Sequence, residues 1–314
     1  MRALTLTSFG GPDSVALADV PEPEAAGDAV TVRVHTVALG PWDVATTEGL
    51  FAGAGGMTTF PQILGWDFAG TIAAAGPAVP TWQPGDRVLG FSPQPWSGIG
   101  AAAELIAVPP GLIAALPAGL DFRAGATVPV TALTAKLTLD TGEVQPGSSV
   151  LVIGAAGAVG GVAVQLGAQL GAQIIASVAA DDFPAVREHG ATHVVDRAAD
   201  LAAQVRRHVA DGVDVTIDLA GPAVWPAAID ATRDGGRFIT TSPAGLPDTV
   251  RGITASAVGV QPDAPALTGL AQRFADGSLR TRIADVLPVT QARDALEAVR
   301  HGSSHGKYVL ELRT

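Results

Sequence analysis

The stretch SSVLVIGAAGAVGGVAVQLG, from Ser148 to Gly167, decides the fold of the chain. Its apolar run Val150–Ile153 predicts a buried strand, and a helix is expected over residues 158–170. The two are joined by a turn that contains three glycines at the spacing GxxGxxG. A strand that runs through a glycine-rich turn into a helix is typical of the first unit of a parallel α/β sheet.

Each small residue of this turn has a physical use. Gly154 permits a tight turn, Ala156 and Gly157 let the backbone approach an anion, and Gly160 lets the helix pack close to the strand. Because the N-terminus of a helix offers free N–H groups and a favourable dipole, the turn predicts a pyrophosphate site of a nicotinamide dinucleotide. The alternative is a close-packed turn without a ligand. The predicted cofactor contacts here are Gly154, Ala155, Ala156, Gly157, Ala158, Val159 and Gly160.

Strands and helices alternate after the turn, which predicts a doubly wound parallel sheet. Further strands are expected at residues 173–178, 194–196, 213–219 and 237–241, and helices at 183–189, 201–209 and 224–232. A helical stretch over 122–139 passes through Pro129, so it is expected to be two helices or one kinked helix.

The first third of the chain has a different pattern. Short alternating runs at residues 29–38, 67–75, 86–91 and 102–108, separated by Gly and Pro turns, predict a small β-barrel or sandwich-like domain. The elements after Pro265 do not continue the α/β alternation cleanly, so they are candidates to return to this first domain.

Composition excludes several classes of protein. The net charge of −11 argues against a nucleic-acid partner, which requires a basic surface. Since the chain has no cysteine, disulfides, thiolate metal sites and a catalytic thiol are ruled out. We expect a protein without a membrane span or signal peptide, located in the cytoplasm.

The ribose end of the dinucleotide is expected about twenty residues after the turn. An acid at the tip of the second strand favours NADH, but Ser177 stands there. Asp181 and Asp182 follow in the turn, where they fit either a ribose contact or a helix N-cap pair. Arg197 is positioned to reach a 2′-phosphate, or else it is a solvated surface residue. We therefore predict NADPH as the cofactor, with NADH possible.

Ordered motifs along the whole chain carry a resemblance to a family. They are FGGPDSVAL (Phe9–Leu17), GPWDVATTEGLF (Gly40–Phe51), ILGWDFAG (Ile63–Gly70), PGDRVLGF (Pro84–Phe91), GAAAELIAVP (Gly100–Pro109), VPVTALTA (Val128–Ala135), GAAGAVG, RDGGRFI (Arg233–Ile239), QPD (Gln261–Asp263) and GKYVL (Gly306–Leu310). In this order the sequence resembles the zinc-independent quinone oxidoreductase branch of the medium-chain dehydrogenase/reductase superfamily.

The resemblance implies an α/β protein with a GroES-like β-barrel domain and a Rossmann doubly wound parallel sheet. We expect the GroES-like catalytic domain at residues 1–121 and 267–314, and the Rossmann dinucleotide-binding domain at 122–266. It also implies a homodimer, and NADPH-dependent reduction of quinones, α,β-unsaturated carbonyls and related hydrophobic acceptors.

The chain departs from the family pattern at several positions. The sister zinc branch has a Cys and a GHE motif where this chain has Ala38-Leu39-Gly40 and Gly65-Trp66-Asp67, so no catalytic metal is expected. Quinone reductases commonly have Asn at Gly40 and often Tyr at Ala45. The lysine that some members use for the 2′-phosphate falls at Phe183, and a tyrosine partner falls at Arg197.

The resemblance and the residue types together nominate site residues. Thr134 is expected at the nicotinamide, with Thr131 one turn earlier; the alternative is a threonine bonded to its own helix. Asp43 is expected near the active site, and the alternative is a helix N-cap. Trp42 and Trp66 are expected to line a flat acceptor pocket, and the alternative is that they are core residues. Our catalytic candidates are Thr134, Asp43 and Trp42, and cofactor contacts are added at Ser177, Arg197, Ser242 and Lys307.

Three functions are compatible with these residues. The first is hydride transfer to a quinone or α,β-unsaturated carbonyl without zinc. The second is a pathway-dedicated enoyl or imine reductase, or a cyclase, of the same fold. The third is a non-catalytic NADPH-binding sensor, which the loss of polar groups at Gly40 and Ala45 would suit.

Overall fold

A computed structural model describes residues 1–23, 27–302 and 306–312 of the chain. The chain divides into two compact units. Unit 1 comprises Met1–Val130 and Pro262–Thr314, and unit 2 comprises Thr131–Gln261. The elements after Pro265 thus return to the unit formed by the N-terminal residues.

Unit 1 is built on two sheets. The smaller has the order β2-β1-β4, formed by Val15–Asp19, Arg2–Leu6 and Gln62–Ile63. The larger has the order β15-β16-β3-β5-β6-β8, and β7 also pairs with β3. Its strands are β3 (Val30–Leu39), β5 (Asp67–Ala75), β6 (Arg87–Phe91), β7 (Leu105–Val108), β8 (Ile113–Ala115), β15 (Ile283–Pro288) and β16 (Lys307–Glu311). These sheets are the expected GroES-like domain.

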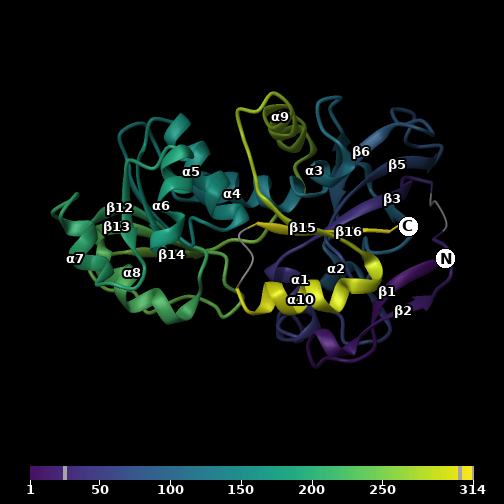
Figure 1. The fold of residues 1–314 in the computed structure, drawn as a ribbon, viewed down its shortest axis with the longest axis horizontal. Coiled ribbons are helices and arrows are strands. Elements are labelled where there is room, and N and C mark those ends of the chain that lie inside the picture. The colour runs from purple at the N-terminus through teal and green to yellow at the C-terminus, as the bar shows by residue number, and fades with distance from the viewer. Residues whose placement is uncertain (24–26, 303–305, 313–314) are drawn as a thin grey trace. The chain divides into compact units, whose positions relative to one another are not determined.

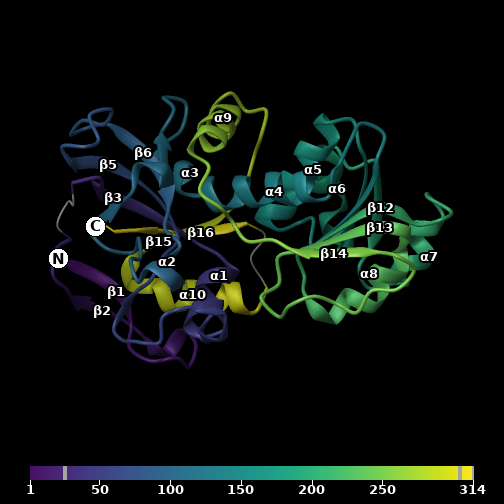
Figure 2. The same ribbon diagram turned by 180° about the vertical axis from the view of Figure 1, so that it is seen from behind.

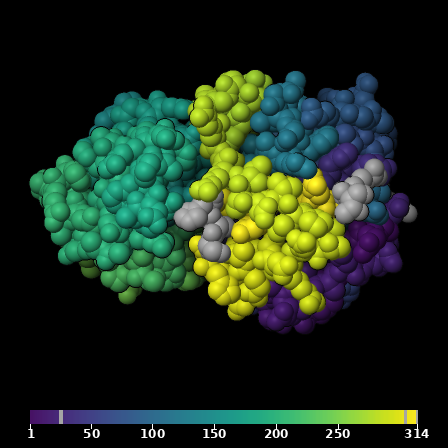
Figure 3. All heavy atoms as spheres, viewed as in Figure 1, coloured from purple at the N-terminus to yellow at the C-terminus, as the bar shows by residue number. Residues whose placement is uncertain are grey.

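The two ends of the chain meet in this larger sheet. β16 pairs antiparallel with β3, with Tyr308 opposite Leu39, so the last strand lies beside an N-terminal one (Figure 1). Figure 3 shows the C-terminal residues, in yellow, on the same face of this unit as the purple N-terminal residues. The helices of unit 1 are α1 (Pro41–Thr47), α2 (Gln94–Ser97), α3 (Phe122–Ala126), α9 (Ala264–Ala275) and α10 (Ala292–Arg300).

Unit 2 contains one parallel sheet with the order β11-β10-β9-β12-β13-β14. The strands are β9 (Ser149–Ile153), β10 (Gln173–Val178), β11 (His193–Asp196), β12 (Val213–Asp218), β13 (Thr232–Thr240) and β14 (Thr254–Ala257). The helices are α5 (Ala158–Gln169), α6 (Phe183–Glu188), α7 (Leu201–Arg206) and α8 (Trp225–Ala231). Figure 2 shows α5 and α6 on one side of this sheet and α8 on the other. The order places β9 at the point where the strand order reverses, which is the Rossmann arrangement.

The boundary between the units differs from the expected one. Residues 122–130 belong to unit 1, because α3 is bonded to its sheet. Thr36 donates a hydrogen bond to the carbonyl of Phe122 at 2.6 Å, and Arg87 donates one to the carbonyl of Leu120 at 2.8 Å. The helical stretch itself is two helices, because α4 (Pro129–Thr141) starts afresh at Pro129.

Candidate functional site

The glycine-rich turn of unit 2 brings bare backbone close to the start of α5. Gly154 has φ of +80°, which a residue with a side chain rarely adopts. A Cβ on Gly160 would lie 2.3 Å from the carbonyl oxygen of Gly154, so only glycine lets α5 begin this close to β9. A Cβ on Gly157 would meet just one atom within 4 Å, the same oxygen at 3.3 Å.

The N-terminus of α5 has donors without helical partners. Gly161 is bonded to the carbonyl of Gly157 at 2.8 Å, so the N–H groups of Ala158, Val159 and Gly160 precede the intrahelical ladder. The N-cap residue, Gly157, has no side chain to satisfy them. These donors and the bare backbone of the turn fit a bound pyrophosphate.

Asp218, at the end of β12, organises the loop that faces this turn. The backbone of Leu219 lies 3.4 Å from the position of a Cβ on Gly154. The carboxylate of Asp218 accepts hydrogen bonds from Ala220 N, Gly221 N, Trp225 Nε1 and Thr240 Oγ1, at 2.8–3.0 Å. We did not nominate Asp218 from the sequence. The available signal was an acid at the end of a predicted strand, two residues before Ala220-Gly221.

The ribose end of the dinucleotide is expected beyond β10. Ser177 is buried, and Asp181 is exposed in the turn that follows. Asp182 occupies the N-cap position of α6, without a side-chain capping hydrogen bond. Arg197 directly follows β11, is exposed, and donates its N–H to the carbonyl of Val178 at 2.9 Å. Arg197 is therefore anchored at the end of β10, where the ribose is expected.

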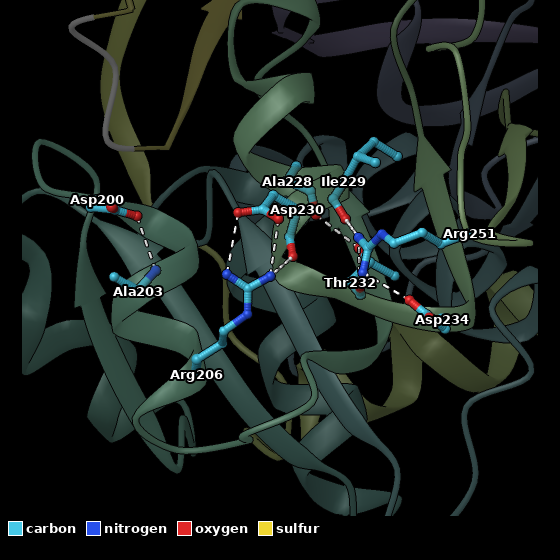
Figure 4. Close-up of polar contacts among 9 residues, drawn as sticks. All are labelled: Asp200, Ala203, Arg206, Ala228, Ile229, Asp230, Thr232, Asp234 and Arg251. Carbon is cyan, nitrogen blue, oxygen red and sulfur yellow. Dashed lines mark hydrogen bonds and ion pairs between the residues drawn. The ribbon is translucent and has the colours of Figure 1, made fainter.

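Several other arginines of unit 2 are already paired. Figure 4 shows Arg206 of α7 directed at Asp230 of α8, 3.0 Å away, and Arg251 directed at Asp234 and the carbonyls of Ile229 and Thr232. Arg233 and Arg237 form ion pairs with Asp214 and Glu143. Within the described ranges, Arg197 forms no ion pair, so its charge is available to an anion.

Two threonines of α4 have unpaired hydroxyls. Thr131 and Thr134 are buried, and their Oγ1 atoms have no hydrogen-bond partner among the described residues. Thr138, one turn later on the same helix, instead donates to the carbonyl of Ala135 at 2.8 Å. The alternative of a threonine bonded back to its own helix thus applies to Thr138 and not to Thr134. A buried unpaired hydroxyl is costly unless a ligand or water satisfies it.

Ser242 lies just beyond β13. Its N–H is bonded to Thr240 Oγ1 at 3.0 Å, and its Oγ accepts from the N–H of Ala244 at 3.2 Å. Since Thr240 also donates to Asp218, Ser242 belongs to the same network as the loop opposite the glycine-rich turn.

In unit 1, a buried ion pair gathers three elements. Nζ of Lys307 (β16) lies 2.7 Å from Oδ2 of Asp67 (β5), and both side chains are buried. Oδ1 of Asp67 accepts the N–H of Val130, in the first turn of α4, at 2.7 Å. We expected Lys307 near the cofactor phosphates. In the structure its ammonium instead forms an ion pair with Asp67, because a buried ammonium requires a counter-charge.

Asp43 lies next to this pair. It is the third residue of α1 and accepts the N–H of Gly40 at 2.8 Å, so Gly40, and not Asp43, is the N-cap. Burial raises the pKa of Asp43 to about 7, against the opposing charge of Lys307. Oδ1 of Asp43 has no partner among the described residues. Burial also raises the pKa of Asp67, again opposed by Lys307.

Gly40 makes room for the ammonium. A Cβ at Gly40 would lie 2.9 Å from Nζ of Lys307. The space that a side chain would occupy at this position is therefore taken by the lysine. Ala45 is buried in the same helix as Asp43.

Four aromatic side chains lie together in unit 1, and we call them the aromatic cluster: Trp42, Phe51, Trp66 and Trp96. Trp42 stacks on Phe51 with ring centroids 5.3 Å apart. Trp66 lies 5.7 Å from Trp42 and 5.9 Å from Trp96, measured between ring centroids. Trp42 and Trp66 were nominated from the sequence, but Phe51 and Trp96 were missed, because Phe51 lies in a loop and Trp96 in the four-residue helix α2, neither of which has a strong sequence pattern.

No group of three or more His, Cys, Asp or Glu residues that could hold a metal ion occurs in the described part of the chain. Two triplets of this chain, Ala38-Leu39-Gly40 and Gly65-Trp66-Asp67, align with the zinc-ligand positions of the sister branch. In the structure Gly40 lies beside Lys307, and Asp67 is bonded to Lys307 and to Val130. Across the described ranges, no helix has the length and apolar character needed to traverse a bilayer.

A GroES-like unit combined with a Rossmann unit defines a class of two-domain dehydrogenases and reductases. Residues 26–118 match the family model described as alcohol dehydrogenase GroES-like domain, and residues 189–310 match the one described as zinc-binding dehydrogenase. The chain belongs to the medium-chain dehydrogenase/reductase superfamily, whose fold implies a nicotinamide cofactor.

Relatives of different kinds are similar to this chain. The human synaptic vesicle membrane protein VAT-1 homolog is 31% identical over 78% of this chain and 62% of its own length. The chloroplastic NADPH-dependent alkenal/one oxidoreductase of Arabidopsis thaliana is 29% identical over 82% of this chain and 66% of its own length. The chain thus spans less than two thirds of these curated relatives.

A solved structure matches over the full length. The structure of the quinone oxidoreductase from Coxiella burnetii superimposes with a TM-score of 0.86 at 26% identity, and covers 100% of this chain and 99% of that one. The correspondence includes both units, so the sequence-based fold class is confirmed.

Proposed function

We propose that the protein is an NADPH-dependent reductase that transfers a hydride to a quinone or an α,β-unsaturated carbonyl without a metal. The observation that carries the proposal is that unit 2 has two sets of hydrogen-bond donors without a partner among the described residues. These are the N–H groups at the start of α5 and the hydroxyls of Thr131 and Thr134. The similarity to an alkenal/one oxidoreductase and a quinone oxidoreductase supports the acceptor class.

Each residue has a proposed role in binding the cofactor. The turn from Gly154 to Gly160 holds the pyrophosphate, and the hydroxyls of Thr131 and Thr134 face the nicotinamide. Arg197 binds the 2′-phosphate, which favours NADPH over NADH. Ser177 and Ser242 lie at the carboxyl ends of β10 and β13, the end of the sheet where ligands bind in this fold.

Reduction of a conjugated carbonyl requires a hydride at one carbon and a proton at another atom of the acceptor. The bound nicotinamide supplies the hydride. Asp43 has a pKa of about 7, so near neutral pH a large fraction of this carboxyl carries a proton. With Oδ2 bonded to Gly40, Oδ1 is the oxygen at which the proton is held and released. The rings of the aromatic cluster, Trp42 among them, bind a flat acceptor and exclude water.

Steady-state turnover with metal-stripped protein tests the proposal. NADPH oxidation is expected to rise when naphthoquinone or benzylideneacetone is added, and to be unaffected by a chelator. Cofactor binding without turnover on a broad panel would favour the non-catalytic sensor instead. Tight binding and turnover of a single acceptor would favour a pathway-dedicated reductase.

Two further expectations accompany this function. We expect a homodimer in the cytoplasm, with a small hydrophobic acceptor as its ligand. Light scattering at several protein concentrations measures the oligomeric state, and fractionation of the source cells measures the location.

A further inference from the structure

The indole of Trp66 has an unsatisfied donor inside the aromatic cluster. Trp66 is 3% exposed, and its Nε1 has no hydrogen-bond partner among the described residues. A tryptophan N–H is a donor only, and leaving it unpaired in the interior costs free energy. Trp66 contrasts with Trp96, whose Nε1 donates to the carbonyl of Ala54 at 3.2 Å.

The surroundings of Trp66 are aromatic on several sides. The ring centroids of Trp42, Phe51 and Trp96 lie 5.7, 6.1 and 5.9 Å from that of Trp66. Trp96 meets Trp66 edge to face, at an interplanar angle of 85°. Such a set of rings offers flat apolar faces, which suit a planar conjugated ring system.

The cluster is continuous with an exposed apolar rim. Trp96 is 44% exposed and Ile99 42%, while Leu50 and Met57 are exposed on the neighbouring loop. This loop is bonded to α2, since the N–H of Met57 donates to the carbonyl of Pro95 at 2.6 Å. Apolar side chains exposed together mark a surface where an apolar ligand binds or enters.

From these observations we propose that the aromatic cluster binds planar aromatic carbonyl compounds, and that Trp66 Nε1 donates a hydrogen bond to their carbonyl oxygen. The inference deepens the proposed function, because it names the acceptor subclass and the group that would polarise its oxygen. Trp66 does not change protonation state in this role. It stabilises the negative charge that develops on the oxygen as the hydride is added.

Binding of a matched ligand pair tests this without turnover. Indanone and indane have the same shape, but only indanone has a carbonyl group. The wild-type protein, without cofactor, is expected to bind indanone about fivefold to tenfold more tightly than indane, which is the contribution of one net hydrogen bond. In Trp66→Phe the ring is largely kept and the N–H is lost, so this preference is expected to fall to near unity.

Trp96→Phe is the matched control. It truncates a ring of the same cluster, but the N–H that it removes is bonded to Ala54. Both ligands are expected to bind more weakly to this variant, with the preference for indanone retained. Equal loss of the preference in both variants, or its retention in Trp66→Phe, overturns the assignment.

An NMR measurement keeps the inference testable if Trp66→Phe does not fold. The chain has five tryptophans, so the labelled protein gives few indole N–H resonances. Indanone is expected to move the Trp66 resonance downfield, and indane is not. An unmoved Trp66 resonance at saturating indanone contradicts the inference. Loss of reductase activity on every acceptor, with this shift present, would contradict only the proposed function.

Discussion

Nζ of Lys307 lies 2.7 Å from Oδ2 of Asp67, although 240 positions separate them in the sequence. The pair joins the last strand of the chain to β5 in the middle of the GroES-like unit. The other oxygen of Asp67 holds the first turn of α4 through Val130. One buried carboxylate therefore binds both the C-terminal strand and the backbone of Val130, the last residue of unit 1 before unit 2 begins.

Asp67→Asn is expected to destabilise the protein by about 3–5 kcal/mol, because it removes the buried carboxylate to which the ammonium of Lys307 is directly paired. Urea unfolding measures the change. The control is Asp140→Asn, which breaks the exposed pair of Lys136 and Asp140 and is expected to cost no more than about 1 kcal/mol. Similar losses of unfolding free energy in the two variants would show that the buried Asp67–Lys307 pair contributes no more to stability than the exposed pair.

Gly40→Asn restores the residue common in quinone reductases, yet it is expected to reduce stability and not to raise activity. The added side chain must enter space where Nζ of Lys307 already lies, 2.9 Å from the position of the new Cβ. Thermal unfolding and turnover are measured together. Gly111→Ala is the control, since nothing lies within 4 Å of a Cβ there. A more active Gly40→Asn enzyme would contradict the packing argument.

Asp43 is expected to make stability depend on pH. Its pKa is 3.8 in the unfolded chain and about 7 in the folded protein, so the folded state binds the extra proton between these values. Its contribution to stability is largest below about 4, falls as the pH rises towards 7, and is constant above that.

Asp43→Asn lacks this proton and keeps an oxygen for the N–H of Gly40. The stability of the variant relative to wild type is expected to increase with pH over the same window, by an amount on the order of a few kcal/mol. Urea unfolding at pH values across the window checks the slope. Asp181→Asn, on an exposed turn, is the control and should give a parallel pH profile. A constant difference between Asp43→Asn and wild type would contradict the raised pKa.

Two glycines of the turn are expected to separate cofactor binding from folding. Gly157→Ala adds a Cβ that meets only one atom, at 3.3 Å, so the fold should tolerate it while the pyrophosphate loses its close approach. Gly160→Ala places a Cβ 2.3 Å from the carbonyl oxygen of Gly154 and is expected to lower stability as well. Isothermal titration with NADPH and thermal unfolding give the two readouts. Undiminished NADPH binding by a folded Gly157→Ala protein would argue for a turn without a ligand.

Arg197→Ala is expected to weaken NADPH binding about tenfold or more and to leave NADH binding nearly unchanged, because only NADPH has the 2′-phosphate. Titration of both reduced cofactors checks this. Arg206→Ala removes an arginine already paired with Asp230 and should not alter the ratio of the two affinities. Equal losses for both cofactors in Arg197→Ala would contradict the phosphate contact.

The Rossmann unit could be predicted well from the sequence, because each element carries a local signal. The apolar strand, the glycine turn and the helix follow one another within Ser148–Gly167, and the alternation of strands and helices after them predicts a doubly wound parallel sheet. β14 was missed, since its four residues, TASA, are all small and too few to give a strong strand pattern.

The candidate site of unit 1 was less accessible to sequence analysis. Asp43 and Trp42 could be nominated, but the pairing of Lys307 with Asp67 depends on β16 returning beside β3. Contacts across such a separation leave no local pattern. The unpaired Nε1 of Trp66 is likewise a property of packing and not of composition.

The fate of the transferred hydrogen tests the central claim most directly. Metal-stripped protein is incubated with benzylideneacetone and NADPH that carries deuterium at the transferable position of the nicotinamide, and the product is analysed by mass spectrometry. Hydride transfer predicts the saturated ketone with deuterium at its β-carbon, in an amount equal to the NADPH consumed. A saturated ketone without deuterium, or no product from any conjugated acceptor while NADPH is bound, would contradict it.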